Sequence, residues 1–171
     1  MKKWMRLGLF LVTVGAAGGF LVSTANGEEG EHNLPPVSNA AWKAECGGCH
    51  MLYHPGLLPE RSWKALLSTL DRHFGENATI DPATREEIAR FLVAHSADRQ
   101  GNRRALRINQ SIPAGEIPLR ITRTRYFQAR HDEVPDAIFV SKSVGSASNC
   151  VACHQGAERG EFSEFKVRIP R

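Results

Sequence analysis

The pentapeptide Cys-x-x-Cys-His occurs twice in this chain, at residues 46–50 and at residues 150–154. This pattern is typical of covalent haem attachment, in which both thiols bond to the porphyrin and the histidine that follows ligates the iron. The two copies use all four cysteines of the chain, so none is left for another role. We therefore predict two c-type haems. The attachment residues are Cys46, Cys49, Cys150 and Cys153, and the proximal iron ligands are His50 and His154.

Four cysteines could also serve in two other ways. In an exported protein they could form two disulfides, with three pairings to choose from. Two Cys-x-x-Cys pairs could instead bind a zinc ion. Neither arrangement requires a histidine directly after the second cysteine, and both copies have one. The sequence therefore favours haem.

Residues 1–25 have the organisation of an export signal. A basic start over residues 1–6 precedes an uncharged, mostly apolar run over residues 7–22, and residues 23–25 (Ser-Thr-Ala) supply the small side chains that a signal peptidase reads. We expect cleavage after Ala25 and a periplasmic protein, because c-type haem is normally attached outside the bacterial cytoplasm. An uncleaved membrane anchor is the alternative, although the apolar run is short for a membrane span.

The charge of the chain gives no argument for binding nucleic acid. Residues 1–25 hold three of the 22 basic residues, which leaves 19 basic against 18 acidic residues. Residues 26–100 carry 7 basic and 11 acidic side chains, whereas residues 101–171 carry 12 and 7. Such asymmetry can orient an encounter with a protein partner. Alternatively, several arginines pair with haem propionates.

Local patterns predict three helices in the first half. Ser-Asn at 38–39 can cap a short helix over residues 40–44 that leads into the first motif. A second helix is expected over residues 59–74, where apolar residues recur with helical spacing before a glycine. A third begins at residue 82, where proline follows the capping Asp81.

The polar, glycine-containing stretch 98–104 separates this half from a second, less regular one. We expect a mainly α protein: a class I cytochrome c-like domain over 26–100 with the first haem, and a smaller irregular domain over 101–171 with the second. Each half has only about seventy residues, a size at which a polypeptide core is marginal. The haems are therefore expected to form part of the core.

The ligand opposite each proximal histidine decides the chemistry of the iron. Two of the three methionines, Met1 and Met5, lie in the signal, and Met51 follows His50 directly and cannot reach across the ring. No methionine is therefore available as a distal ligand. The distal position is either filled by histidine or open.

Five further histidines remain: His32, His54, His73, His95 and His131. His54 lies too close to His50 in sequence, and His32 lies near the start of the mature chain. His73 is favoured over His95, because the distal ligand of the class I fold precedes the last helix. Beyond the boundary only His131 is available besides His154. It precedes its motif, so it either ligates the second haem or crosses to the first.

The sequence resembles the small bacterial dihaem cytochromes c. The matching segments, in order, are 45–51, 56–59, 73–78, 131–134 and 144–154. The resemblance implies that both haems have two histidine ligands, with His73 and His131 as the distal ones. It also implies an electron-donor role toward a monohaem, oxygen-binding c-type cytochrome, and linkage to a membrane b-type cytochrome. His54 stands where the family is expected to have an apolar residue or proline.

The leading functional hypothesis is a non-enzymatic electron carrier without a small-molecule substrate. Two histidines on each iron leave no coordination position for a substrate, so only outer-sphere transfer remains. Two alternatives are a dihaem peroxidase-type enzyme with an open haem site and the small dihaem subunit of a periplasmic nitrate reductase. The first is usually a much longer chain, and the class I-like first half argues against the second.

Overall fold

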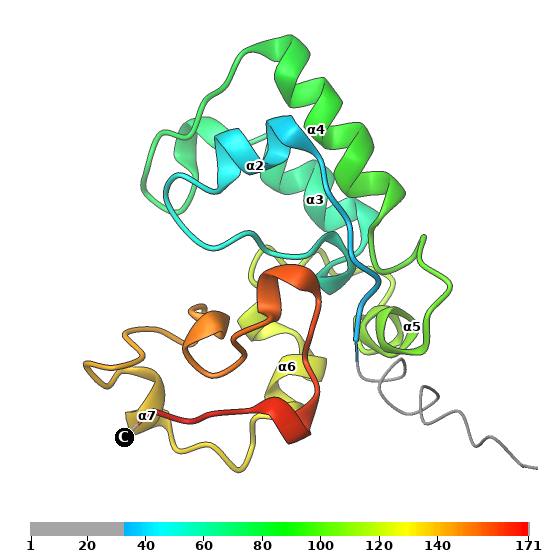
Figure 1. Cartoon of the computed structure of the whole chain (residues 1–171). Coiled ribbons are helices and arrows are strands. Elements are labelled where there is room, and N and C mark those ends of the chain that lie inside the picture. The colour runs from blue at the N-terminus through cyan, green and yellow to red at the C-terminus, as the bar shows by residue number, and fades with distance from the viewer. Residues whose placement is uncertain (1–32, 171) are drawn as a thin grey trace, which may run out of the picture.

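The computed structural model describes residues 33–170, and within that range the regular structure is entirely helical. Short 3₁₀ turns link the α-helices. The α-helices are α2 (Ala40–Cys46), α3 (Glu60–Leu67), α4 (Pro82–Ala94), α5 (Arg103–Gln110), α6 (Arg125–Arg130) and α7 (Asp136–Phe139). Figure 1 shows α2, α3 and α4 gathered in one half of the molecule, with α5, α6 and α7 in the other. The expectation of a mainly α protein is confirmed.

The first half has its own apolar core between α2, α3 and α4. The core residues are Trp42, Leu58, Trp63, Leu66, Leu67, Ile88 and Leu92. Most of them come from the apolar positions whose helical spacing is visible in the sequence. Burying these large side chains supplies the main free energy that holds the three helices together.

Side-chain caps begin two of these helices as predicted. The Oδ1 of Asn39 accepts the backbone N–H of Trp42 at 2.7 Å at the start of α2. Asp81 accepts the N–H groups of Ala83 and Thr84 at 3.0 Å at the start of α4. Each cap satisfies backbone donors that have no partner inside the helix.

The predicted helix over 59–74 is too long, because α3 ends at Leu67. The hydroxyl groups of Ser68 and Thr69 both donate to the carbonyl of Ala65, at 2.8 and 3.2 Å. Such side-chain bonds compete with the helical backbone ladder. The chain then forms a separate 3₁₀ turn, Leu70–Arg72, which carries it to His73.

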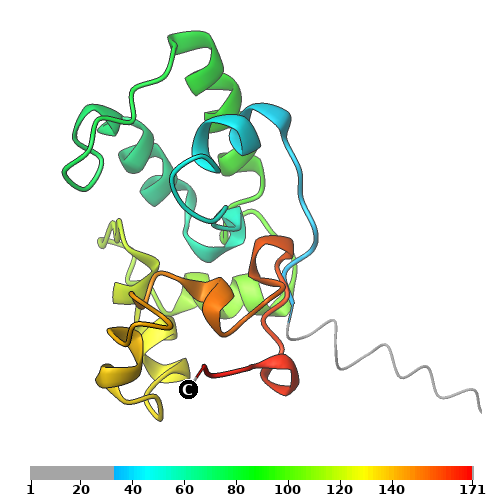
Figure 2. The ribbon, with the colours of Figure 1, turned by 60° about the vertical axis from the view of Figure 1, so that its left-hand side comes forward.

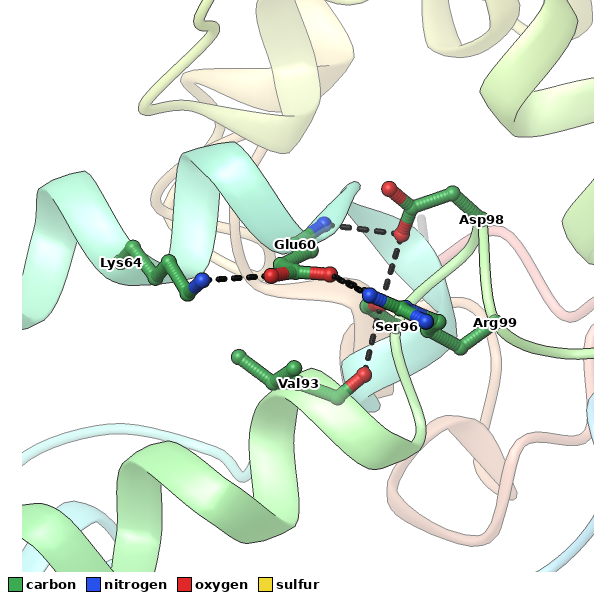
Figure 3. A network of polar contacts seen from close by, with 6 residues as sticks. All are labelled: Glu60, Lys64, Val93, Ser96, Asp98 and Arg99. Atoms are coloured by element: carbon green, nitrogen blue, oxygen red, sulfur yellow. Dashed lines mark hydrogen bonds and ion pairs between the residues drawn. The ribbon is translucent and has the colours of Figure 1, made fainter.

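A polar network joins the start of α3 to the end of α4 (Figure 3). Pro59 gives α3 no side-chain cap, and Asp98 takes that place by accepting the N–H of Glu60 at 2.9 Å. The same carboxylate oxygen lies 2.6 Å from the hydroxyl of Ser96. Glu60 in turn binds Arg99 at 2.6 Å. Residues about forty positions apart thus fix the angle between two helices.

A second apolar core lies between the two halves. Its buried residues are Leu34, Leu57, Ala97, Ala105, Ile108, Ile112, Ala157 and Phe162. The N–H of Leu34 donates to the carbonyl of Gly160 at 2.8 Å, and Asn33 accepts the N–H of Phe162 at 2.9 Å. Both views show the segment before α2 running down to the other half (Figures 1 and 2). A cut at 98–104 would therefore divide this core, and the two-domain boundary stays a prediction.

The helix α5 begins inside the stretch 98–104, where the sequence predicts the domain boundary. Asn102 caps it by accepting the N–H of Ala105 at 2.7 Å. Its buried face consists of Arg104, Ala105 and Ile108. Two apolar residues in an arginine-rich segment are too few for the helical spacing to be recognised in the sequence.

No helix within residues 33–170 has the length and apolar character needed to cross a membrane. The predicted signal over 1–25 lies outside the described residues.

Candidate functional site

The first Cys-x-x-Cys-His motif begins at the last residue of α2. Cys46 closes the helix, and a Cβ at Gly47 would come within 2.7 Å of the carbonyl oxygen of Lys43, so this tight exit needs glycine. The Nδ1 of His50 lies 2.7 Å from the carbonyl oxygen of Met51. Because a carbonyl only accepts, Nδ1 carries the proton and Nε2 keeps a free lone pair. His50 is thus in the tautomer that a metal ion requires at Nε2.

The structure brings His73 to His50. Their ring centres are 6.2 Å apart and their planes differ by 32°. His73 starts a tight turn in which Phe74 and Gly75 both have positive φ, at 54° and 104°, and the N–H of Glu76 donates to the His73 carbonyl at 3.1 Å. Two central residues with positive φ are the pattern of a type I′ turn, and phenylalanine adopts this backbone only under strain.

The second motif forms a 3₁₀ turn, Cys150–Ala152, and the N–H of His154 donates back to Cys150 at 2.7 Å. His131 lies opposite His154, with ring centres 6.1 Å apart and planes at 82°. It follows the last residue of α6, and its Nδ1 donates to the carbonyl of Phe127 at 2.8 Å. Its ring stacks on that of Phe127 at 4.0 Å. These contacts orient the imidazole and leave Nε2 free.

Both histidine pairs have the separation that a shared metal ion requires. Imidazole nitrogens bind first-row metals at about 2 Å, so an ion midway between two rings holds their centres about 6 Å apart. The pairs are His50 with His73 and His131 with His154, at 6.2 and 6.1 Å. Each pair comes from one motif and one histidine outside it. Each motif histidine thus faces a histidine from its own half of the chain.

A largely apolar cavity surrounds the second pair, between α5, α6 and the second motif. Its wall includes Cys150, Cys153, His131 and His154. Aliphatic and aromatic side chains complete it, among them Ile108, Ile121, Val134, Phe139, Val144 and Phe162. The two thiols, the two imidazoles and the apolar side chains in this wall fit the donor set and the flat apolar face of a haem.

Burial sets the protonation states in this cavity. It lowers the pKa of His154 to about 4, with smaller contributions from the neighbouring His131 and Arg104. It also raises the pKa of the Cys150 thiol to about 11. A buried imidazole prefers its neutral form, which is the form that binds a metal.

The other uses of four cysteines find no support. Cys46, Cys49, Cys150 and Cys153 are all free, so none is in a disulfide. Among residues 33–170, no group of three or more His, Cys, Asp or Glu side chains is arranged to hold a metal ion. Two protein ligands per iron suffice in a haem, because the porphyrin supplies the other four nitrogens.

Two other candidate histidines make different contacts. Both ring nitrogens of the fully buried His54 are used, with Nε2 donating to Pro35 and Nδ1 accepting from Gly56. His95 follows the last residue of α4, where its Nδ1 donates to the Phe91 carbonyl at 2.9 Å and its ring centre lies 4.8 Å from that of Phe91. This bond leaves its Nε2 free, but its ring is paired with Phe91 and not with a motif histidine. His32 lies outside the described residues.

Tyr53 connects the two motifs, and no sequence pattern pointed to it. Its ring lies 5.0 Å from that of His50, and its hydroxyl donates to the carbonyl of Ser148 at 3.0 Å. Nearby, the N–H of Leu52 donates to Glu158 at 2.9 Å. The segment that leaves the first motif therefore packs directly against the second.

Comparison with known proteins shows the family of the chain. The family model described as dihaem cytochrome c matches residues 42–162. The chain belongs to the dihaem cytochrome c family. A diheme cytochrome c from Rhodobacter sphaeroides is 44% identical, with 75% of this chain and 99% of that chain covered and a TM-score of 0.66. A diheme cytochrome type c from Shewanella baltica is 38% identical, with 77% and 93% covered and a TM-score of 0.63.

A further structure, of DHC purified from Rhodobacter sphaeroides, is 39% identical, covers 74% of this chain and 99% of that chain, and has a TM-score of 0.60. No curated protein matches. As a dihaem cytochrome c the chain carries two c-type haems, and the cysteines for their thioether bonds are present. Electron transfer is the function that membership of this family implies.

Proposed function

We propose that this dihaem cytochrome c is a periplasmic electron carrier whose two irons each have two histidine ligands. His50 and His73 would hold the first iron, and His154 and His131 the second. The observation that carries the proposal is the separation of the two ring pairs, 6.2 and 6.1 Å. Cys46 and Cys49 would attach the first haem, and Cys150 and Cys153 the second.

In this proposal the protein side chains hold the haems and tune their reduction potentials. They neither form nor break bonds during electron transfer. Each bound haem supplies a one-electron couple. His50 and His131 are fixed by hydrogen bonds from Nδ1 to backbone carbonyls, which keep Nε2 directed to the metal and make the ring a stronger donor. A haem iron with two imidazole ligands has a lower reduction potential than one with histidine and methionine. It also has no free coordination position for a substrate. The chain therefore acts as a carrier and not as an enzyme.

A protein partner receives or supplies the electrons in this proposal. The resemblance to small bacterial dihaem cytochromes c favours a monohaem c-type cytochrome as acceptor and linkage to a membrane b-type cytochrome. The uneven charge of the two halves, with an excess of acidic residues over 26–100 and of basic residues over 101–171, would orient such an encounter. Stopped-flow mixing of the reduced protein with a monohaem c-type cytochrome tests the partner, and a rate that falls with added salt is expected.

The first test is the visible spectrum of the reduced holoprotein before and after addition of carbon monoxide. A sharp low-spin spectrum that the gas leaves unchanged is expected, because both irons have six ligands. A shift in part of the signal would mean that one distal histidine is absent or displaced. The peroxidase-type alternative would then replace the carrier.

A further inference from the structure

Arg104 is a buried arginine in the wall of the second cavity. Only 8% of its surface is exposed, although it lies in the first turn of α5. Its guanidinium carbon lies 5.9 Å from the ring centre of Tyr126 and 5.7 Å from that of Phe162. One terminal nitrogen, Nη2, donates to the Phe162 carbonyl at 3.2 Å. The side chain is thus fixed at the edge of the cavity that contains His131 and His154.

This guanidinium has no anion among the described residues. Its Nε is buried and has no hydrogen-bond partner, and no carboxylate within residues 33–170 forms an ion pair with it. Glu164 is the carboxylate in the cavity wall, and it pairs with Arg130. A buried cation without a counter-ion is strongly unfavourable. Among residues 33–170 nothing supplies the negative charge, which a bound ligand could bring.

The haem attached at Cys150 and Cys153 carries two propionate carboxylates. We propose that the guanidinium of Arg104 binds one of them, and that this buried positive charge raises the potential of the second haem. The planar guanidinium suits a carboxylate better than any other cation, because it presents parallel donors in a fixed plane. The inference rests on the second haem centre of the proposed function.

Other charged groups near Arg104 belong to several elements. Arg107 lies on α5, and Tyr126 and Arg130 lie on α6. His131, His154 and Glu164 also line the cavity. Of the cationic side chains in the wall, Arg130 already has Glu164 as a partner. Arg104 is the arginine in the wall that has no carboxylate partner among residues 33–170, so it can bind a propionate.

Redox titration of the holoprotein tests the proposal with the variants Arg104→Gln and Arg104→Lys. Arg90→Gln is the matched control, since Arg90 lies on the exposed face of α4 and pairs with Glu86. The second-haem potential is identified as the one missing from a variant with Cys150→Ala and Cys153→Ala. Arg104→Gln should favour the oxidised second haem at least tenfold, which is about 59 mV for a one-electron couple. The first haem and the control should not move.

The pH dependence of the second-haem potential distinguishes two explanations. Arg104 either contacts a propionate directly or acts on the haem only through its charge at a distance. Without Arg104 the propionate is no longer held ionised, so the second-haem potential of Arg104→Gln should rise as the pH falls from about 7 to 5. Arg104→Lys keeps the charge and the alkyl stem but loses the planar guanidinium, so a smaller shift in the same direction is expected.

Three results would overturn the proposal: equal shifts of both haems, an unchanged second potential, or a shift without the new pH dependence. If Arg104→Gln fails to bind haem, Arg104→Lys decides alone, and wild-type behaviour of that variant contradicts the contact. Failure of the proposed function is seen separately, in the carbon monoxide spectrum. A carbon monoxide shift leaves the titration of Arg104 variants interpretable.

Discussion

The Nε2 of His54 donates a hydrogen bond to the carbonyl oxygen of Pro35, 2.8 Å away, in a fully buried position. The Nδ1 of the same ring accepts the N–H of Gly56 at 3.0 Å, which caps the 3₁₀ turn Pro55–Leu57. These two bonds require the neutral ring with its proton on Nε2. Burial accordingly lowers the pKa of His54 below its ordinary value. His54 is therefore a structural residue that ties the segment before α2 to the first motif.

His54 should make the stability of the protein fall in mild acid. The unfolded chain protonates this histidine near its ordinary pKa of about 6.5, whereas the folded protein resists protonation. Its contribution is therefore complete above about pH 6.5 and declines as the pH falls below it, by at most about 1.4 kcal/mol per pH unit. Denaturant unfolding between about pH 5 and pH 8 measures this slope. His54→Gln should flatten it, and an unchanged slope would contradict the assignment.

Replacing one distal histidine by methionine should change one haem only. His73→Met is expected to raise the potential of the first haem, and His131→Met that of the second, because a thioether favours ferrous iron more than imidazole does. Redox titration of each variant measures both potentials. His95→Met, at the end of α4, is the control and should leave both unchanged. Equal shifts of both haems in either variant would show that the pairing is wrong.

The hydroxyl of Tyr53 should stabilise the contact between the two motifs. Tyr53→Phe removes its hydrogen bond to Ser148 and should lower the free energy of unfolding by about 1 kcal/mol. Thermal or denaturant unfolding of the holoprotein measures this change. Tyr126→Phe removes a hydroxyl that has no hydrogen bond within residues 33–170 and serves as control. A loss as large in the control would assign the effect to general packing.

Asp98 should matter more for stability than the ion pairs beside it. Asp98→Ala leaves the first N–H of α3 without its cap and should lower the free energy of unfolding by about 1 kcal/mol. Arg99→Ala breaks a solvent-exposed ion pair with Glu60 and should cost less, since water screens exposed charges. Urea unfolding of both variants gives the comparison. A larger loss in Arg99→Ala would show that the ion pair holds these helices together.

Local patterns sufficed for the parts of the fold that depend on neighbours in sequence. Asn39 and Asp81 were predictable as caps because a cap acts on backbone groups two or three residues away. The core positions of α3 and α4 follow from helical spacing in the same way. The end of α3 was not predictable from that spacing, because the hydroxyl groups of Ser68 and Thr69 compete for the backbone.

The sequence by itself determined the two haem motifs, and thereby the cofactor, since each motif is a short contiguous set of donors. It also limited the distal ligands to a few histidines. Only the tertiary structure decided which imidazole lies opposite which, that Tyr53 joins the two motifs, and that Arg104 has no anion among residues 33–170. The physical reason is that these relations depend on burial and on contacts between distant segments. Such contacts form only when the chain has folded and both apolar cores are packed.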